Sequence, residues 1–180
     1  MKRKSIVLTF IVIISFAASS TFAQSVYKKE DKIGQVGLGL GFGGIYGSVS
    51  FPPISFGFQY GIHEKISVGG IIGYTSSTEE VFFARNYEWK YSYIVIGARG
   101  EYHFLENVDK VDGYAGATLG YNIVSVSEPT GFGGTYSASG SYLLFGVHVG
   151  GRYYFNPQIA AFAELGYGLG YLTVGVAFKL

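Results

Sequence analysis

The chain ends in the stretch LTVGVAFKL (172–180), in which large apolar side chains alternate with small or polar ones. Successive side chains of a β-strand point to opposite faces, so this stretch predicts a strand with one apolar face. Similar alternation recurs on about eight segments. Several carry charges on the second face, as at Arg99, Glu101 and Arg152. A charged face opposite an apolar one predicts a transmembrane β-barrel with its apolar face turned toward lipid.

The composition suits such a barrel and excludes several other classes. The 180 residues include 28 glycines, 16 tyrosines and 15 phenylalanines, and they are long enough for one domain. Charged residues make up 14%, against about 25% in an average soluble domain. There are no cysteines, which excludes disulfides, thiolate metal sites and a lipid anchor on cysteine. No concentrated basic patch indicates nucleic acid.

The first residues have the three parts of a secretory signal: positive charges at 2–4, an apolar run at 6–18 and small residues up to Ala23. The apolar run is shorter than the ~20 residues of a membrane-spanning helix. Cleavage is expected after Ala23, with Ser20 as the second position. The expected parts are a signal peptide (1–23), a solvated periplasmic lead-in (24–32) and a barrel domain (33–180). Cleavage leaves ten basic and twelve acidic residues, a net charge near −2.

Eight strands are expected along the barrel domain, at 33–42, 54–62, 66–75, 89–104, 114–126, 141–155, around 162–167 and at 172–180. A three-residue turn is expected to pair Ile62 with Ile66. Polar segments 76–88 and 127–140 are expected as loops outside the cell, and 105–113 as a charged periplasmic turn. Short inner turns and longer outer loops are typical of bacterial outer-membrane barrels.

Aromatic residues near the strand ends are expected to mark the two membrane interfaces. Those assigned to the periplasmic side are Tyr60, Phe104, Phe155 and Phe178, and those assigned to the outer side are Tyr74, Tyr121, Tyr142 and Tyr167.

The C-terminal part of the chain also resembles a known family. The stretches AELGYG (163–168) and VGVAFKL (174–180) are similar to the closing hairpin of small eight-stranded outer-membrane β-barrel proteins, the group of the OmpA transmembrane domain and OmpX, often described as porin-family barrels. The resemblance covers nearly all of the chain after the signal. It implies an antiparallel up-and-down barrel in the outer membrane of a Gram-negative bacterium. The family usually ends on an aromatic residue, whereas here Phe178 precedes a terminal Leu180.

The most notable polar constellation lies on the inward face and comprises Arg99, Glu101, His148, Arg152 and Glu164. An eight-stranded barrel has an interior just wide enough for side chains, so these groups are expected to meet. Around the turn at 156–158, Arg152 and Glu164 would be diagonal neighbours roughly 7 Å apart, which predicts an ion pair between them. The network is interpreted as a plug of the lumen. An ion or proton path, or a catalytic acid with His148 as base, is the alternative.

No catalytic, cofactor-binding or metal-binding residue is predicted, and the chain is not expected to be an enzyme. A lipid-modifying hydrolase would need a histidine with a hydroxyl nucleophile at the lipid face. His63 is expected in a periplasmic turn, and His103 and His148 are expected to point inward. None of the three is placed for lipid chemistry.

The expected function is a structural or surface-interaction role in the outer membrane, with outer-membrane lipid and lipopolysaccharide around the wall and an extracellular partner at the outer loops. The protein is expected to be a monomer. Passive transport of small solutes is the alternative and needs an open lumen. A soluble barrel with an internal ligand needs apolar lumen residues, whereas Arg99 and Glu164 occupy inward positions. The charged loop residues Glu79, Glu80, Arg85 and Glu88 are interpreted as solvated.

Overall fold

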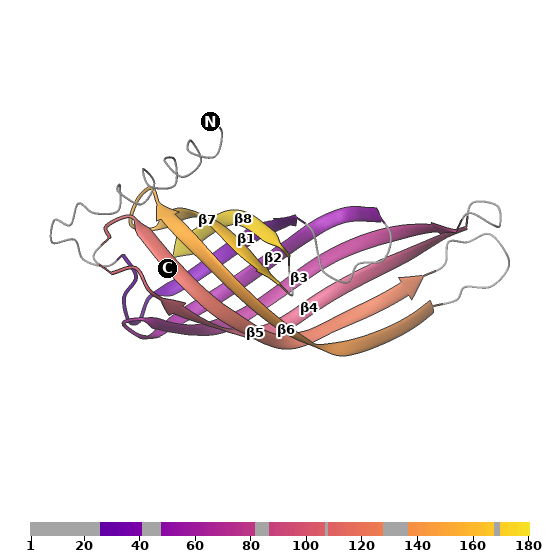
Figure 1. Cartoon of the computed structure of the whole chain (residues 1–180), viewed down its shortest axis with the longest axis horizontal. Coiled ribbons are helices and arrows are strands. Elements are labelled where there is room, and N and C mark those ends of the chain that lie inside the picture. The colour runs from indigo at the N-terminus through magenta and orange to yellow at the C-terminus, as the bar shows by residue number, and fades with distance from the viewer. Residues whose placement is uncertain (1–25, 41–47, 82–86, 107, 128–136, 168–169) are drawn as a thin grey trace, which may run out of the picture.

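The computed structural model describes residues 26–40, 48–81, 87–106, 108–127, 137–167 and 170–180. Its strands are β1 (Lys32–Leu40), β2 (Ser48–His63), β3 (Ile66–Val81), β4 (Tyr87–His103), β5 (Val111–Ser127), β6 (Ser137–Tyr154), β7 (Ile159–Tyr167) and β8 (Leu172–Lys179). Each strand pairs antiparallel with the next, and β1 pairs with β8 to close the barrel (Figure 1). The eight-stranded antiparallel barrel is therefore confirmed. The expected signal peptide lies outside the described residues.

The two ends of the barrel are distinguished by the connections between their strands. The connections at 64–65, 104–110 and 155–158 lie at one end, here called the turn end, where the C-terminus also lies (Figure 1). The opposite end is called the loop end. No helix in the described parts of the chain is long and apolar enough to cross a membrane.

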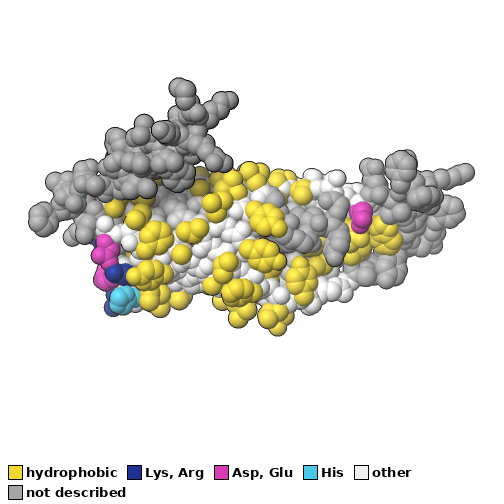
Figure 2. Space-filling view, in the orientation of Figure 1, with side chains coloured by type: hydrophobic (Ala, Val, Ile, Leu, Met, Phe, Trp, Pro, Cys, Tyr) yellow, Lys and Arg dark blue, Asp and Glu magenta, His cyan; other side chains and the backbone are white. Residues whose placement is uncertain are grey.

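The outer wall is apolar and the lumen is polar. Leu119 at the middle of β5 is 56% exposed and Phe145 on β6 is 61% exposed, whereas Arg152 is 0% exposed. Figure 2 shows apolar side chains over the wall, with the coloured charged groups near its ends. Wherever the structure describes the residues, those expected outward are exposed or half-exposed and those expected inward are buried or half-buried. This arrangement is that of a transmembrane barrel.

Several strands run further than the sequence pattern predicted. β3 continues to Val81 and β4 begins at Tyr87, so most of the expected loop 76–88 is strand. Likewise β5 reaches Ser127 and β6 starts at Ser137, so the loop expected at 127–140 is shorter. Beyond the membrane both faces of a strand are free to be polar, so the backbone ladder continues where the apolar alternation has stopped.

Two expected details at the strand ends are wrong. His63 pairs with Ile66 and Gly61 pairs with Ser67, so the turn has two residues and Ile62 forms a bulge instead of pairing with Ile66. Ile62 is nevertheless exposed on the outer wall, as expected. Tyr142 is not part of the lipid-facing aromatic belt, because its hydroxyl accepts a 2.6 Å hydrogen bond from the inward amide of Asn122.

Two glycines make room for Phe162 inside the barrel. A Cβ atom at Gly37 would lie 2.9 Å from the Phe162 ring, and one at Gly175 would lie 2.7 Å from it. Gly37 and Gly175 are directly paired across the β1–β8 seam. The buried ring therefore covers the backbone where the barrel closes.

The Gly175→Ala variant is expected to lose about 1–3 kcal/mol of folding free energy through overpacking. The added methyl group would overlap the Val36 carbonyl oxygen, which belongs to the rigid backbone ladder. Urea unfolding in lipid vesicles measures the loss. Gly34→Ala is the control, because nothing lies within 4 Å of a Cβ atom there. Equal stability of the two variants would contradict the tight seam.

Candidate functional site in the lumen

Four charged residues from β4, β6 and β7 form the centre of the lumen. Arg152 Nη2 lies 2.9 Å from Glu101 Oε2, and Arg99 Nε lies 3.1 Å from Glu101 Oε1. Arg99 Nη2 lies 2.7 Å from Glu164 Oε2. The expected cluster is thus confirmed, with His148 Nε2 accepting a 3.1 Å hydrogen bond from Arg99.

The ion pair expected between Arg152 and Glu164 is wrong. The register that suggested it is correct, since Gly150 pairs with Glu164 and Phe162 pairs with Arg152. However, Glu164 binds Arg99 of β4, and Arg152 turns toward Glu101 of β4. In this narrow lumen these ion pairs form across the interior, between side chains of strands that are not neighbours.

Asp112 is the second acid of Arg152, with Nη1 at 2.9 Å from Oδ2. The sequence pattern places Asp112 in a charged turn at 105–113, which is wrong for this residue. In the structure β5 begins at Val111, so Asp112 is an inward strand residue and is buried. The alternation of β5, followed back from Thr118, points to this position.

Neutral side chains complete the network. Gln35 donates to Glu164 over 3.2 Å and accepts from Arg152 over 2.9 Å. It therefore links the Arg99–Glu164 pair to the Arg152–Glu101 pair. Gln59 donates to Glu101, and Tyr114 donates to Glu164. Buried charges are strongly disfavoured unless they are paired and hydrogen-bonded. The lumen pairs each of these charges with residues from both halves of the chain, and only Arg152 Nε and Gln59 Oε1 of this network are buried without a partner among the described residues.

A chain of three polar groups lies between this network and the turn end. Ser67 Oγ is 3.0 Å from His103 Nε2, and His103 Nδ1 is 2.7 Å from Asp112 Oδ1. This is the order of groups in a Ser-His-Asp triad. Ser67 is fully buried, however, so its hydroxyl is closed to substrate in this conformation. The arrangement satisfies buried polar atoms and presents no nucleophile.

The charged part of the lead-in is solvated as expected, since Lys28, Lys29 and Glu30 are exposed, but its Tyr27 is inserted into the barrel. Tyr27 is 1% exposed, and its ring stacks on His103 with centroids 3.5 Å apart. The single phenol hydrogen is shared between the carbonyl oxygens of Ile66, at 2.8 Å, and His63, at 3.1 Å. Burial raises the pKa of the Tyr27 phenol, so it remains a neutral donor at physiological pH. A single inserted side chain leaves no periodic signal in the sequence.

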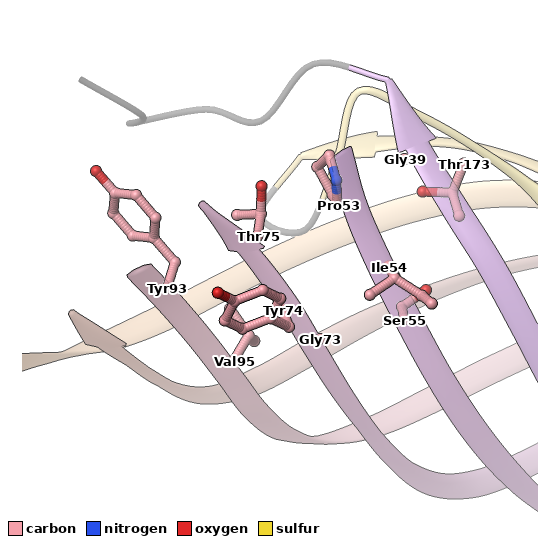
Figure 3. Close-up of a pocket in the computed structure, with 10 residues that line it drawn as sticks. All are labelled: Gly39, Pro53, Ile54, Ser55, Gly73, Tyr74, Thr75, Tyr93, Val95 and Thr173. Carbon is pink, nitrogen blue, oxygen red and sulfur yellow. The ribbon is translucent and has the colours of Figure 1, made fainter. Parts of the chain in front are cut away.

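Only small spaces are described in the lumen. A cavity beside Arg99, His148 and Glu164 has a volume of about 30 Å³. A second, of about 20 Å³, lies nearer the loop end, where Figure 3 shows Tyr93, Thr75 and Pro53 around it. Spaces of this size hold about one water molecule each. They provide no volume for a solute.

The histidines lie where the sequence predicted them. His103 and His148 face the lumen, and His63 is exposed at the end of β2. None of the three lies on the lipid-facing wall. Among the residues described, no group of three or more His, Cys, Asp or Glu side chains could hold a metal ion.

Comparison with known proteins identifies the fold. No family model and no curated protein matches the sequence. The crystal structure of Ail, the attachment invasion locus protein of Yersinia pestis, in complex with the heparin analogue sucrose octasulfate, is similar with a TM-score of 0.53 and 17% identity, over 83% of this chain and 95% of that one. The N-terminal β-barrel domain of Pseudomonas aeruginosa OprF is similar with a TM-score of 0.50 and 16% identity, over 84% of this chain and 98% of that one. These similarities confirm the fold of the small outer-membrane barrels that the closing hairpin resembles.

Proposed function

We propose that this chain, a small barrel of the outer-membrane type, is a non-conducting surface protein that presents a β-sheet outside the cell for contact with a partner. The observation that carries the proposal is the length of β3 to β6. These strands have 16, 17, 17 and 18 residues, and β2 beside β3 also has 16, whereas β1, β7 and β8 have 9, 9 and 8. A tilted transmembrane strand needs about 9–11 residues. Seven residues of β3 and of β4, and four of β5 and of β6, extend beyond the membrane.

The projecting part is here called the extension, and it comprises residues 75–81, 87–93, 124–127 and 137–140. It lies beyond a row of paired residues formed by Tyr74, Ile94, Ile123 and Ser141. Four to seven residues of strand correspond to about 13–23 Å. Figure 1 shows β3 to β6 reaching past the ends of β1, β7 and β8 at the loop end.

The extension has a free backbone edge. Pairing between β6 and β7 begins at Val147, so within the described residues the part of β6 that belongs to the extension, positions 137–140, pairs with β5 alone. An exposed strand edge offers unpaired N–H and C=O groups to an added strand of another protein. The proposed partner is accordingly a protein with an extended segment.

The charge at this end also bears on the partner. Segments 75–93 and 124–140 contain the acids Glu79, Glu80, Glu88 and Glu128 and the bases Arg85 and Lys90. The Ail complex contains a heparin analogue, a polyanion. An excess of acidic residues repels polyanions, so the partner proposed for this chain is neutral or basic.

Cysteine labelling tests the orientation, because the natural chain has no cysteine. Ser139→Cys lies on the extension and Gln158→Cys in a turn at the other end, and both positions are exposed. A membrane-impermeant maleimide is expected to label the Ser139→Cys variant in intact cells. The Gln158→Cys variant is expected to react only after the outer membrane is permeabilised. Labelling in the reverse order would place the extension in the periplasm and overturn the proposed surface role.

Conductance separates the proposed role from passive transport. The purified barrel in a planar lipid bilayer is expected to give no unitary current steps, since paired charged side chains fill the centre of the lumen and the cavities beside it and nearer the loop end are of about 30 and 20 Å³. A matched preparation of a known porin shows that insertion and recording work. Steady unitary steps from this chain would favour the porin alternative.

A further inference from the structure

We propose that residues 26–31 form a stopper that closes the turn end of the lumen, with Tyr27 as the inserted side chain. The proposal deepens the non-conducting role proposed above by assigning closure of the periplasmic end to one short segment of the chain itself. Residues 26–31 are called the strap below, and stopper refers to their proposed role. The proposal rests on the contacts of the strap with β2 and with β8.

The strap is held by backbone hydrogen bonds to β2. Glu30 N donates to the Gly61 carbonyl over 2.8 Å, and Gly61 N donates to the Asp31 carbonyl over 2.8 Å. Gly61 also makes room for the strap, because a Cβ atom there would lie 2.8 Å from both the Lys28 carbonyl and the Tyr27 hydroxyl. Glu30 adopts a positive φ of 72°, which turns the strap back toward β1. The backbone of the strap is therefore docked on β2, while the side chains of Lys28, Lys29 and Glu30 remain exposed.

The other side of the strap is held by β8. Lys179 Nζ forms an ion pair of 2.6 Å with Asp31 Oδ2 and donates to the Val26 carbonyl. The same Asp31 oxygen accepts a 2.8 Å hydrogen bond from Lys28 N, which closes a tight turn within the strap. The strap is therefore fastened to β2 and to β8, on either side of β1.

The inserted ring covers the polar centre. Tyr27 stacks on His103, whose ring nitrogens bind Ser67 and Asp112. Asp112 in turn binds Arg152. Tyr27 also packs in an apolar cluster with Ile33, Tyr154, Ala160, Phe162 and Ala177. Removal of the ring uncovers His103 first, and through it the charged network that fills the lumen.

Reaction of the folded barrel with diethyl pyrocarbonate tests this, because the chain has three histidines at informative positions. The imidazole nitrogen attacks a carbonyl carbon of the reagent, ethyl carbonate leaves, and mass spectrometry locates the product. His63 is exposed at the same end and serves as the internal standard. In the natural chain His103 is expected to react at least tenfold more slowly than His63. In Tyr27→Ala its rate is expected to rise at least tenfold, while His148, deeper in the lumen, stays protected.

Two variants control the result. Tyr60→Ala removes an equal ring from the lipid-facing wall near the same end and is expected to leave His103 protected. Tyr27→Phe keeps the stacked ring and loses the two hydrogen bonds, so its rate is expected to lie between those of the natural chain and Tyr27→Ala. A heat-dependent shift on gels shows that each variant is folded. If Tyr27→Ala does not fold, Asp31→Ala, which releases the Lys179 anchor, takes its place with a smaller expected rise.

The strap is not a stopper if His103 reacts as fast as His63 in the natural chain, or if its rate is the same with and without the Tyr27 ring. Either result would leave the proposed surface role intact, since that role depends on the maleimide and conductance experiments. Current steps from the natural chain would contradict both the non-conducting role and closure of the lumen, even with His103 protected.

Discussion

The Glu101→Ala variant is expected to lose about 3–5 kcal/mol of folding free energy, the cost of removing one partner from a buried charge pair. Glu101 accepts contacts from Arg152, Arg99 and Gln59. The substitution leaves two buried guanidinium groups with one carboxylate fewer between them. The barrel in lipid vesicles is unfolded with increasing urea, and the folded fraction is followed as the gel band that shifts on heating. The urea midpoint of this loss gives the change in folding free energy.

Glu106→Ala is the matched control. Glu106 also forms an ion pair, with Lys65, but the two side chains are 53% and 41% exposed at the turn end. Exposed pairs contribute about 0–1 kcal/mol. The two variants remove the same group from the same kind of pair and differ in burial. Similar small losses in both would show that the lumenal network does not hold the barrel together.

Replacing Leu119 with arginine is expected to cost about 2–4 kcal/mol and to slow insertion into vesicles, because a charge at the lipid face near the bilayer midplane is unfavourable. Leu119 lies at the middle of β5 and is 56% exposed. In a soluble barrel such an exposed position would accept arginine at almost no cost. The variant therefore tests directly which solvent the wall contacts.

Ser125→Arg provides the comparison on the same strand and face. Ser125 is exposed and belongs to the extension, beyond the apolar belt. Arginine is expected to change the free energy there by about 0–1 kcal/mol, as it does near a membrane interface. A large loss at Ser125 with none at Leu119 would mean that the bilayer is placed incorrectly along the strands.

The inward and outward faces could be predicted because the two-residue period of a strand is rigid. Once Leu143 and Phe145 were placed outward, His148 and Arg152 had to point inward, and the register across the 156–158 turn followed. The strand ends were harder to predict. The apolar alternation reports contact with lipid and stops at the membrane boundary, whereas the hydrogen-bond ladder of β3 to β6 does not.

Contacts across the lumen could not be predicted in the same way. The partner of Glu164 is Arg99, 65 residues away and on a strand that is not a neighbour. Which inward side chains face one another depends on the stagger of all the strands around the barrel, and no pattern within one strand encodes it. The insertion of Tyr27 was missed for a related reason, since its site on His103 exists only once the barrel has closed.

That dependence has a consequence for the order of assembly. Val26 contacts Lys179 across a separation of 153 residues, so this contact cannot form until β8 has been made. Contacts of such long range are slow to form. The strap is made before the barrel strands but is among the last segments to reach its final position. It can dock completely only after β8 has paired with β1.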